Sequence, residues 1–137
     1  MRLELTKRAD YAIRASLALA RTGGDERRSV RRLALEEHIP ARFLVQVMGD
    51  LVAAGLVEGA AGRTGGYRLR RSPVAITLLD VVEAVEGDSR RRRCVLRGGP
   101  CRIVGVCDVH AVFAAAQDDL LKHLAEATLE SVVRAPH

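Results

Sequence analysis

Apolar residues recur every three or four positions in several stretches of this chain, and that period predicts helices. The first stretch begins after Thr6, a residue type that favours the helix N-cap, and runs to about Arg21 before Gly23 and Gly24. A second, short helix is expected to begin after Ser29, another N-cap residue, and to stop before residues 38–40. The close spacing of these signals predicts two helices joined by a short connection.

Pro40 and Gly55 bracket a third helix, because proline is favoured at the first helical position and glycine just past the last. Its apolar positions predict a buried face made of Phe43, Leu44, Val47, Met48 and Leu51. A helix, a tight turn and a second helix form the arrangement that places a recognition helix in the major groove of DNA. The second and third helices therefore predict a helix-turn-helix.

The outer face of the third helix carries side chains that can read bases. Arg42 can pair bidentately with guanine and Gln46 with adenine, and Gly49 permits close approach of the backbone. Arginines around the preceding helix are placed for phosphates, and we count Arg28, Arg31 and Arg32 among the DNA-binding candidates. An ordinary helical hairpin with exposed charges is the alternative.

Two short apolar runs, residues 56–58 and 67–69, read as strands that flank the glycine-rich run 59–66, so this piece is expected to be a β-hairpin wing. A phosphate-cradling nucleotide loop is the rival interpretation, but no Lys-Ser or Lys-Thr follows the glycines, and a strand comes next. Arg63 at the tip of the wing can enter the minor groove or touch phosphate.

Two more helices are expected downstream. Thr77 can cap one that ends near Gly87, and a longer one begins near Asp108. The long helix has an apolar stripe formed by Val109, Val112, Phe113, Ala116, Leu120, Leu121 and Leu124. Because the winged core is small, we expect this stripe to pack on its symmetry mate in a homodimer, with packing on its own domain as the alternative.

These elements predict a mainly α fold with a small β-hairpin wing, that is, a winged helix-turn-helix followed by a long C-terminal dimerisation helix. We expect a winged helix-turn-helix DNA-binding domain over residues 1–87, a cysteine cluster loop over residues 88–107, and the dimerisation helix with a C-terminal tail over residues 108–137.

The net charge of +5 is concentrated in the first part of the chain. Residues 101–137 carry three basic and five acidic side chains, so residues 1–100 hold a net charge of +7. This asymmetry favours a polyanionic partner such as double-stranded DNA. No apolar run approaches the roughly 20 residues that span a bilayer, and no secretory leader is recognisable. We therefore expect a cytoplasmic protein without a membrane partner.

The chain has three cysteines, Cys94, Cys101 and Cys107, followed by His110. An odd count and a setting of arginines and glycines favour ligand thiolates over disulfides or buried core thiols. Spacings of six and five residues suit an iron–sulfur cluster. A structural zinc site of the Cys3His type and a thiol-redox site are the alternatives, although zinc sites usually have closer cysteine pairs. No catalytic signature is present, so we do not expect an enzyme.

Four motifs occur in order with these cysteines: residues 40–46, 54–57, 62–67 and 76–82. Together they resemble the family of small winged-helix bacterial regulators that contains IscR and the nitric oxide sensor NsrR, over about residues 3–133. The resemblance implies a homodimer whose iron–sulfur cluster is held by the three cysteines and controls affinity for promoter DNA. The family commonly has five residues between successive cysteines, whereas six separate Cys94 from Cys101 here.

The resemblance implies two candidates for the fourth ligand. His110 matches the IscR-like position, where a 2Fe-2S cluster is held by three cysteines and a histidine. Asp10 matches the NsrR-like position, where a carboxylate from the other subunit completes a 4Fe-4S cluster. We favour Asp10 and a 4Fe-4S cluster, because a ligand from the first helix connects the cluster directly to the DNA-binding half.

Overall fold

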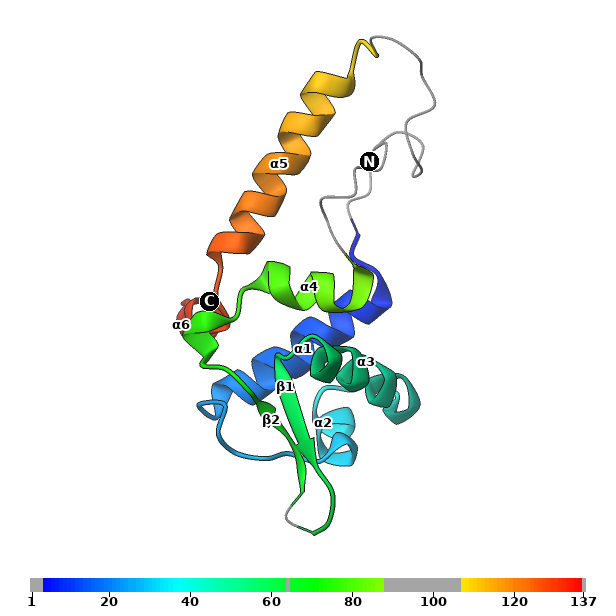
Figure 1. The fold of residues 1–137 in the computed structure, drawn as a ribbon, viewed down its shortest axis with the longest axis vertical. Helices are drawn as coiled ribbons and strands as arrows, with labels where there is room; N and C mark the ends of the chain where they lie inside the picture. Colours follow the sequence, from blue (N-terminus) through cyan, green and yellow to red (C-terminus); the bar gives the residue numbers. More distant parts are fainter. Residues whose placement is uncertain (1–3, 64, 88–106, 137) are drawn as a thin grey trace.

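A computed structural model describes residues 4–63, 65–87 and 107–136 (Figure 1). The elements in chain order are α1 (Lys7–Arg21), α2 (Val30–Glu36), α3 (Ala41–Ala53), β1 (Val57–Ala60), β2 (Gly66–Leu69), the 3-10 turn η1 (Pro73–Ala75), α4 (Leu78–Glu86), α5 (His110–Glu126) and α6 (Leu129–Arg134). The chain is mainly helical with one antiparallel hairpin, so the expected winged-helix fold class is confirmed.

The helices begin where the capping residues predict. The Thr6 hydroxyl accepts a hydrogen bond from the backbone N–H of Ala9, and the Ser29 hydroxyl accepts one from the N–H of Arg32. Thr77 and Asp80 exchange reciprocal side-chain-to-backbone bonds of 3.0 and 2.9 Å, which form a capping box. These bonds satisfy N–H groups that have no partner within the helix.

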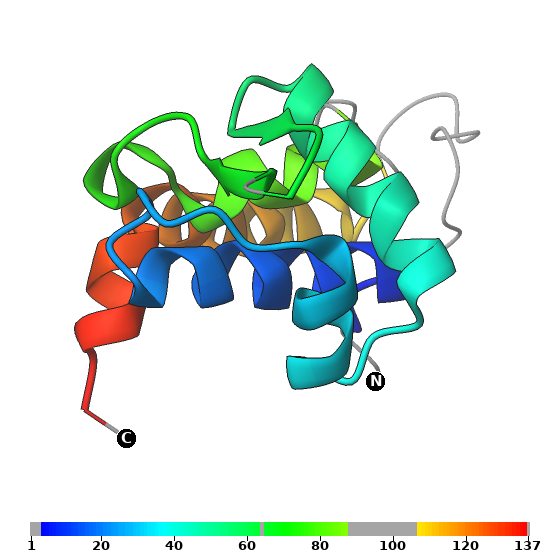
Figure 2. The ribbon, with the colours of Figure 1, turned by 90° about the horizontal axis from the view of Figure 1, so that it is seen from below.

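The core is built around α1, whose buried positions are mostly small. They are Ala9, Ala12, Ala15, Ser16, Ala18, Leu19 and Ala20. Methyl side chains allow neighbouring elements to approach closely, and α1 contacts α3, α4, α6 and β2. Figure 2 shows α1 running through the middle of the molecule with these elements gathered along it. The larger buried side chains include Leu33 of α2 and Leu44, Met48 and Leu51 of α3.

The hairpin wing is fixed to the segment before α2. In the hairpin Val57 pairs with Leu69 and Ala60 with Gly66, and Tyr67 forms an antiparallel bridge with Arg28 through N–H···O bonds of 2.7 and 2.8 Å. Gly66 lies at a φ of +111°, and a Cβ there would lie 2.6 Å from the Arg28 carbonyl oxygen. Only glycine allows the wing to approach this closely.

The turn between α2 and α3 depends on His38. It is the one non-glycine among the described residues with positive φ, at 54°, which is the left-handed conformation that commonly ends a helix. The backbone N–H of Ile39 donates to the carbonyl of Ala34 over 2.9 Å, so the last turn of α2 is closed and the chain redirected into α3.

Two structural features differ from the sequence predictions. Phe43 was expected in the buried face of α3, but the residue is 45% exposed. The four other predicted positions fill that face at helical spacing, and Phe43 lies at its edge. In addition, the chain has a short C-terminal helix, α6, that the sequence did not indicate.

α5 and α6 relate differently to the winged core. α5 has no fully buried residue, contacts α4, and extends away from the other helices (Figure 1). In contrast, Leu129 at the start of α6 is fully buried in the core, and its N–H donates to the carbonyl of Ile76 over 2.9 Å. We therefore propose that α6 belongs with residues 1–87, and that α5 alone forms the separate helical element of the expected 108–137 unit.

Within the part of the chain that the structure describes, no helix is both long enough and apolar enough to cross a membrane.

The burial of Leu129 leads to a stability prediction. Leu129→Ala should lower the free energy of unfolding by about 2–5 kcal/mol, because it leaves a cavity in the core. Val74→Ala, at a 63% exposed position in η1, is the matched control and should change it by less than about 0.5 kcal/mol. Urea denaturation measures both. Equal, small effects would contradict the inclusion of α6 in the core.

Candidate DNA-binding interface and metal centre

The exposed face of α3 presents the side chains expected to read bases. Arg42, Val45, Gln46 and Gly49 are all exposed, at the spacing of successive turns of one helix face. The opposite face, from Leu44 to Leu51, is buried, so α3 is held firmly against the core. A Cβ at Gly49 would meet nothing within 4 Å, which leaves the backbone open to a partner.

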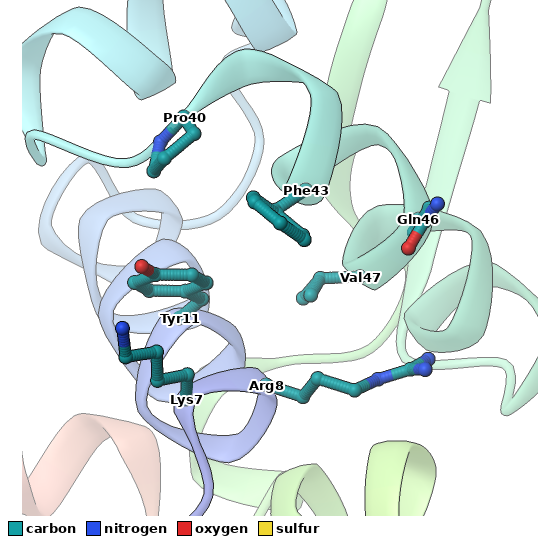
Figure 3. A pocket seen from close by; sticks show the side chains of 7 residues that line it. All are labelled: Lys7, Arg8, Tyr11, Pro40, Phe43, Gln46 and Val47. Carbon is teal, nitrogen blue, oxygen red and sulfur yellow. The ribbon is translucent and has the colours of Figure 1, made fainter.

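A cleft separates the first turns of α1 from α3 (Figure 3). Its volume is about 360 Å³, and it is lined by Lys7, Arg8 and Tyr11 of α1 and by Pro40, Phe43, Gln46 and Val47 at the start of α3. The Arg42 guanidinium lies 5.6 Å from the centre of the Phe43 ring, within cation–π range. Sequence reasoning missed this cleft, because nothing in the local pattern indicates that α1 and α3 leave a gap between them.

The arginines in and just before α2 do not share one environment. Arg31 and Arg32 are exposed, and Arg32 forms a 2.8 Å ion pair with Glu36 one turn later. The Arg28 side chain is only 11% exposed; it contacts Glu36 and donates to the Ala18 carbonyl over 3.3 Å. These contacts, with the bridge to Tyr67, are those of a residue that joins α1, α2 and the wing.

The wing carries a cluster of charges that the sequence analysis did not single out. Arg68 donates to Glu58 over 2.6 Å, and Arg27 lies 3.9 Å from the same carboxylate. The hydrogen bond from Arg68 and the charges of Arg68, Arg27 and Arg70 hold the pKa of Glu58 below its ordinary value. The alternation of Arg68 in β2 and Arg70 just after it is the signal that could have revealed this basic face. Arg63 is exposed near the tip.

The candidate metal ligands are only partly within the described residues. Cys94 and Cys101 lie outside them. Cys107 is a half-buried free thiol, and its carbonyl accepts a 3.1 Å hydrogen bond from the backbone N–H of His110, so these two residues lie within one turn at the start of α5. Among residues 4–63, 65–87 and 107–136, no three His, Cys, Asp or Glu side chains gather to hold a metal ion.

Asp10 lies apart from that pair within one chain. It is in the first turn of α1, and its carboxylate accepts a 3.0 Å hydrogen bond from Arg14. The start of α5 is at the far end of that helix from the core, well away from α1 (Figure 1). Any site that combines Asp10 with Cys107 and His110 therefore needs a second copy of the chain or a different arrangement of the chain.

The first turn of α1 connects two other regions. The Thr6 hydroxyl donates to the Glu86 carboxylate at the end of α4 over 2.6 Å, and Arg8 forms an ion pair with Asp50 of α3. Glu86 stands just before the cysteine segment in the sequence, so this turn contacts both the end of α4 and α3.

The sequence also matches known proteins over almost its whole length. The model of the Rrf2 family, described as iron-dependent transcriptional regulators, matches residues 5–135. The chain belongs to the Rrf2 family. It is 31% identical over 134 residues to protein aau3 of Rhizobium meliloti, and the match covers 97% of this chain and 86% of that protein. It is 30% identical over 132 residues to the transcriptional regulator NsrR of Halalkalibacterium halodurans, covering 96% and 90% of the two chains.

Solved structures share the fold of this Rrf2 protein. CymR of B. subtilis, named as a global cysteine regulator, superimposes with a TM-score of 0.82 at 23% identity over 99% of this chain and 100% of the other. IscR of T. potens gives 0.79 at 23% identity over 96% and 87%. With the family match and the exposed recognition helix, the chain is a DNA-binding transcriptional regulator and not an enzyme.

The charge cluster on the wing leads to a second prediction. Glu58→Gln should raise affinity for every DNA sequence about twofold to fivefold at low salt, because it removes a negative charge from among three arginines that can face phosphates. Electrophoretic mobility shifts on a specific and a random duplex measure this. Glu130→Gln on α6 is the control and should have no effect. A gain confined to one sequence would contradict the electrostatic explanation.

The lowered pKa of Glu58 also fixes the sign of its pH dependence. Its ion pairs stabilise the hairpin above the ordinary glutamate range, and that stabilisation is lost as pH falls through the lowered pKa of the folded state. The free energy of unfolding of the wild type should therefore exceed that of Glu58→Gln at neutral pH, and the two values should become equal only in acid.

Proposed function

We propose that this regulator binds promoter DNA as a homodimer, with α3 in the major groove and the wing beside it, and that an iron–sulfur cluster in the cysteine segment controls its affinity. The observation that carries the DNA part is the exposed face of α3. Arg42, Val45 and Gln46 point to solvent there, while the opposite face of the helix is buried in the core. In this assignment Arg42 and Gln46 contact bases, and Arg31, Arg32 and Arg63 contact phosphates.

The contacts of Arg28 support a different role from the predicted phosphate contact. Its guanidinium is engaged by Glu36 and the Ala18 carbonyl, and freeing it would break both contacts. We therefore assign Arg28 to holding the wing and α2 in register, so that Arg63 and α3 meet the DNA together.

The exposed apolar side chains of α5 support dimerisation. Val112 is 70% exposed and Leu120 is 49% exposed, and Phe113, Leu121 and Leu124 are only half-buried. Burying such side chains against a second α5 contributes roughly 25 cal/mol for each Å² removed from water. A two-fold dimer would also place two recognition helices on two half-sites of one operator.

The donor set fits an iron–sulfur cluster. Cys94, Cys101 and Cys107 would supply three thiolates, with Asp10 of the partner subunit or His110 of the same chain as the fourth ligand. Such a cluster, when bound, ties its ligands together and reacts with oxidants or nitric oxide. Asp10 is exposed and held by one surface ion pair, which a stronger ligand interaction can replace.

The chain's own contacts offer a route from the cysteine segment to the DNA. Glu86 is the last residue of α4 before that segment. It accepts a hydrogen bond from Thr6, which caps α1, and Arg8 in the first turn of α1 forms an ion pair with Asp50 of α3. A displacement of the chain after Gly87 would therefore act on the first turn of α1 and through it on α3. In a dimer, small shifts change the spacing of the two recognition helices, to which affinity is sensitive.

A winged-helix regulator with a structural zinc or thiol-redox site is the second candidate function. The half-buried free thiol of Cys107 is compatible with it. The visible absorption of anaerobically prepared protein distinguishes the candidates, because zinc and thiols are colourless and iron–sulfur clusters are not.

The DNA assignment is tested by comparing two arginines. Arg42→Ala should relax sequence preference at a cost of about 1–3 kcal/mol, whereas Arg63→Ala should weaken all sequences alike and reduce the slope of affinity against salt by about one. Titrations on a selected and a random duplex measure both, with Arg134→Ala on α6 as the control. Equal losses on the two duplexes for Arg42→Ala would contradict the placement of α3.

The cluster assignment is tested by ligand substitution. Replacing Cys94, Cys101 or Cys107 by Ala should abolish the colour and the bound iron and sulfide. If Asp10 is the fourth ligand, Asp10→Ala should leave a labile or smaller cluster and disturb DNA binding, whereas His110→Ala should be nearly silent; the reverse pattern indicates an IscR-like site. Full iron and sulfide in all three cysteine variants would rule out the cluster.

A heterodimer separates ligation across the dimer from ligation within one chain. One subunit carries Asp10→Ala, and the other carries Ala at all three cysteines. The intact cysteines then face the intact Asp10 of the other subunit, so half the normal cluster content at wild-type stability is expected. A labile or absent cluster would show that the partner's Asp10 does not complete the site.

A further inference from the structure

We propose that the cleft between the first turns of α1 and α3 holds one phosphodiester unit of the bound DNA, with the phosphate at Lys7 and Tyr11 and the deoxyribose against Phe43. This inference rests on the proposed DNA-binding function and adds a contact from α1, an element to which no DNA contact has been assigned above. Four properties of the cleft support it.

The first property is charge. Two cationic side chains, Lys7 and Arg8, line the cleft, and no acidic side chain does. Arg8 is engaged by Asp50, whereas Lys7 forms no ion pair with any described residue. In Figure 3 the Lys7 ammonium points toward the same side as the Tyr11 hydroxyl, so a positive charge and a hydrogen-bond donor lie together at one edge of the cleft. That pair suits a phosphate oxygen.

The second property is the apolar centre. The Phe43 ring stands between the two walls (Figure 3) and is 45% exposed although Val47 beside it is buried. An exposed aromatic ring flanked by cations is typical of a surface that takes an amphipathic group. A sugar-phosphate unit has that character, because its CH groups can cover a ring while its phosphate meets the cations.

The third property is continuity with the recognition face. Gln46 lines the cleft and also belongs to the exposed face of α3 that is proposed to read bases. Figure 3 places Gln46 at the edge of the cleft opposite Lys7 and Tyr11. A DNA strand whose base meets Gln46 therefore has its backbone beside the cleft. This continuity favours the DNA backbone over a free anion, because a free anion would not need a base-reading residue next to its site.

The fourth property is rigidity. Arg8 joins the first turn of α1 to Asp50 of α3, and Ala9 and Ala12 of the same helix are fully buried. The backbone of Lys7 is thus held at a fixed position relative to α3. A fixed cation positions DNA, whereas a cation on a mobile tail contributes attraction without register. The volume of about 360 Å³ is at the small end for ligand pockets, which suits a single unit of the backbone.

The chain offers a matched pair of variants, since Lys7 and Lys122 are its only lysines. Lys7→Gln should weaken binding to a duplex selected from random sequence and to a random duplex by the same factor, and should lower the slope of log affinity against log salt by about 0.9 per half-site. Lys122→Gln removes the same charge from an exposed position on α5 and should leave the affinity for both duplexes and the salt slope unchanged. Tyr11→Phe should weaken binding to both duplexes by a smaller factor and leave the salt slope unchanged.

A phosphate scan locates the contact. Single phosphates of the selected duplex are replaced by neutral methylphosphonates, and each duplex is titrated with the wild type and with Lys7→Gln. At one phosphate in each half-site the two changes should be non-additive, because each removes the same interaction. Circular dichroism and thermal unfolding confirm that the variants are folded.

The outcomes are distinct from those for the proposed function. Additive losses at every phosphate, or a Lys7→Gln variant that matches Lys122→Gln, would overturn this inference while Arg42→Ala still relaxes sequence preference. A loss confined to the selected duplex would also overturn it, because a backbone contact does not depend on sequence. If instead the wild type shows no sequence preference and Arg42→Ala changes nothing, the proposed function itself fails.

Discussion

The close packing of α1 through its alanine side chains is the constraint on which the rest of the molecule depends. Because positions such as Ala12 and Ala15 carry only a methyl group, α3, α4, α6 and β2 can all lie against one helix. A larger side chain at any of these positions would push a neighbour outward and force strained rotamers. The first turn of α1 is fixed by the same packing, so the distance between the end of α4 and the recognition helix is set by a single rigid element.

Much of this arrangement follows from local sequence. The capping residues Thr6, Ser29 and Thr77 predicted the starts of three helices, because each supplies a hydroxyl at the point where backbone N–H groups lack partners. Two short strand-like runs on either side of a glycine-rich run predicted the hairpin. The exposed face of α3 follows from its helical period, since the four buried positions determine which side chains must point outward.

What could not be predicted depends on contacts between distant segments. Arg28 reads as a surface cation, and only the fold shows that Glu36, Ala18 and Tyr67 surround it. Phe43 matches an apolar stripe, yet the cleft beside α1 leaves its ring exposed. The choice between Asp10 and His110 as fourth ligand of the proposed cluster also depends on such contacts, because the two candidates differ in which chain brings them near the cysteines, and Cys94 and Cys101 lie outside the described residues.

The position of Leu129 has a consequence for how the protein is made. A nascent chain that has reached Gly87 contains the recognition helix and the wing, but the space in the core that Leu129 fills is still open. Domains generally fold as units during synthesis, and this unit is completed only when α6 has left the ribosome. By then the cysteine segment and α5 have already been translated. The DNA-binding half therefore gains its full stability only in chains that also carry the cysteine segment and α5, and a chain that stops before α6 lacks it.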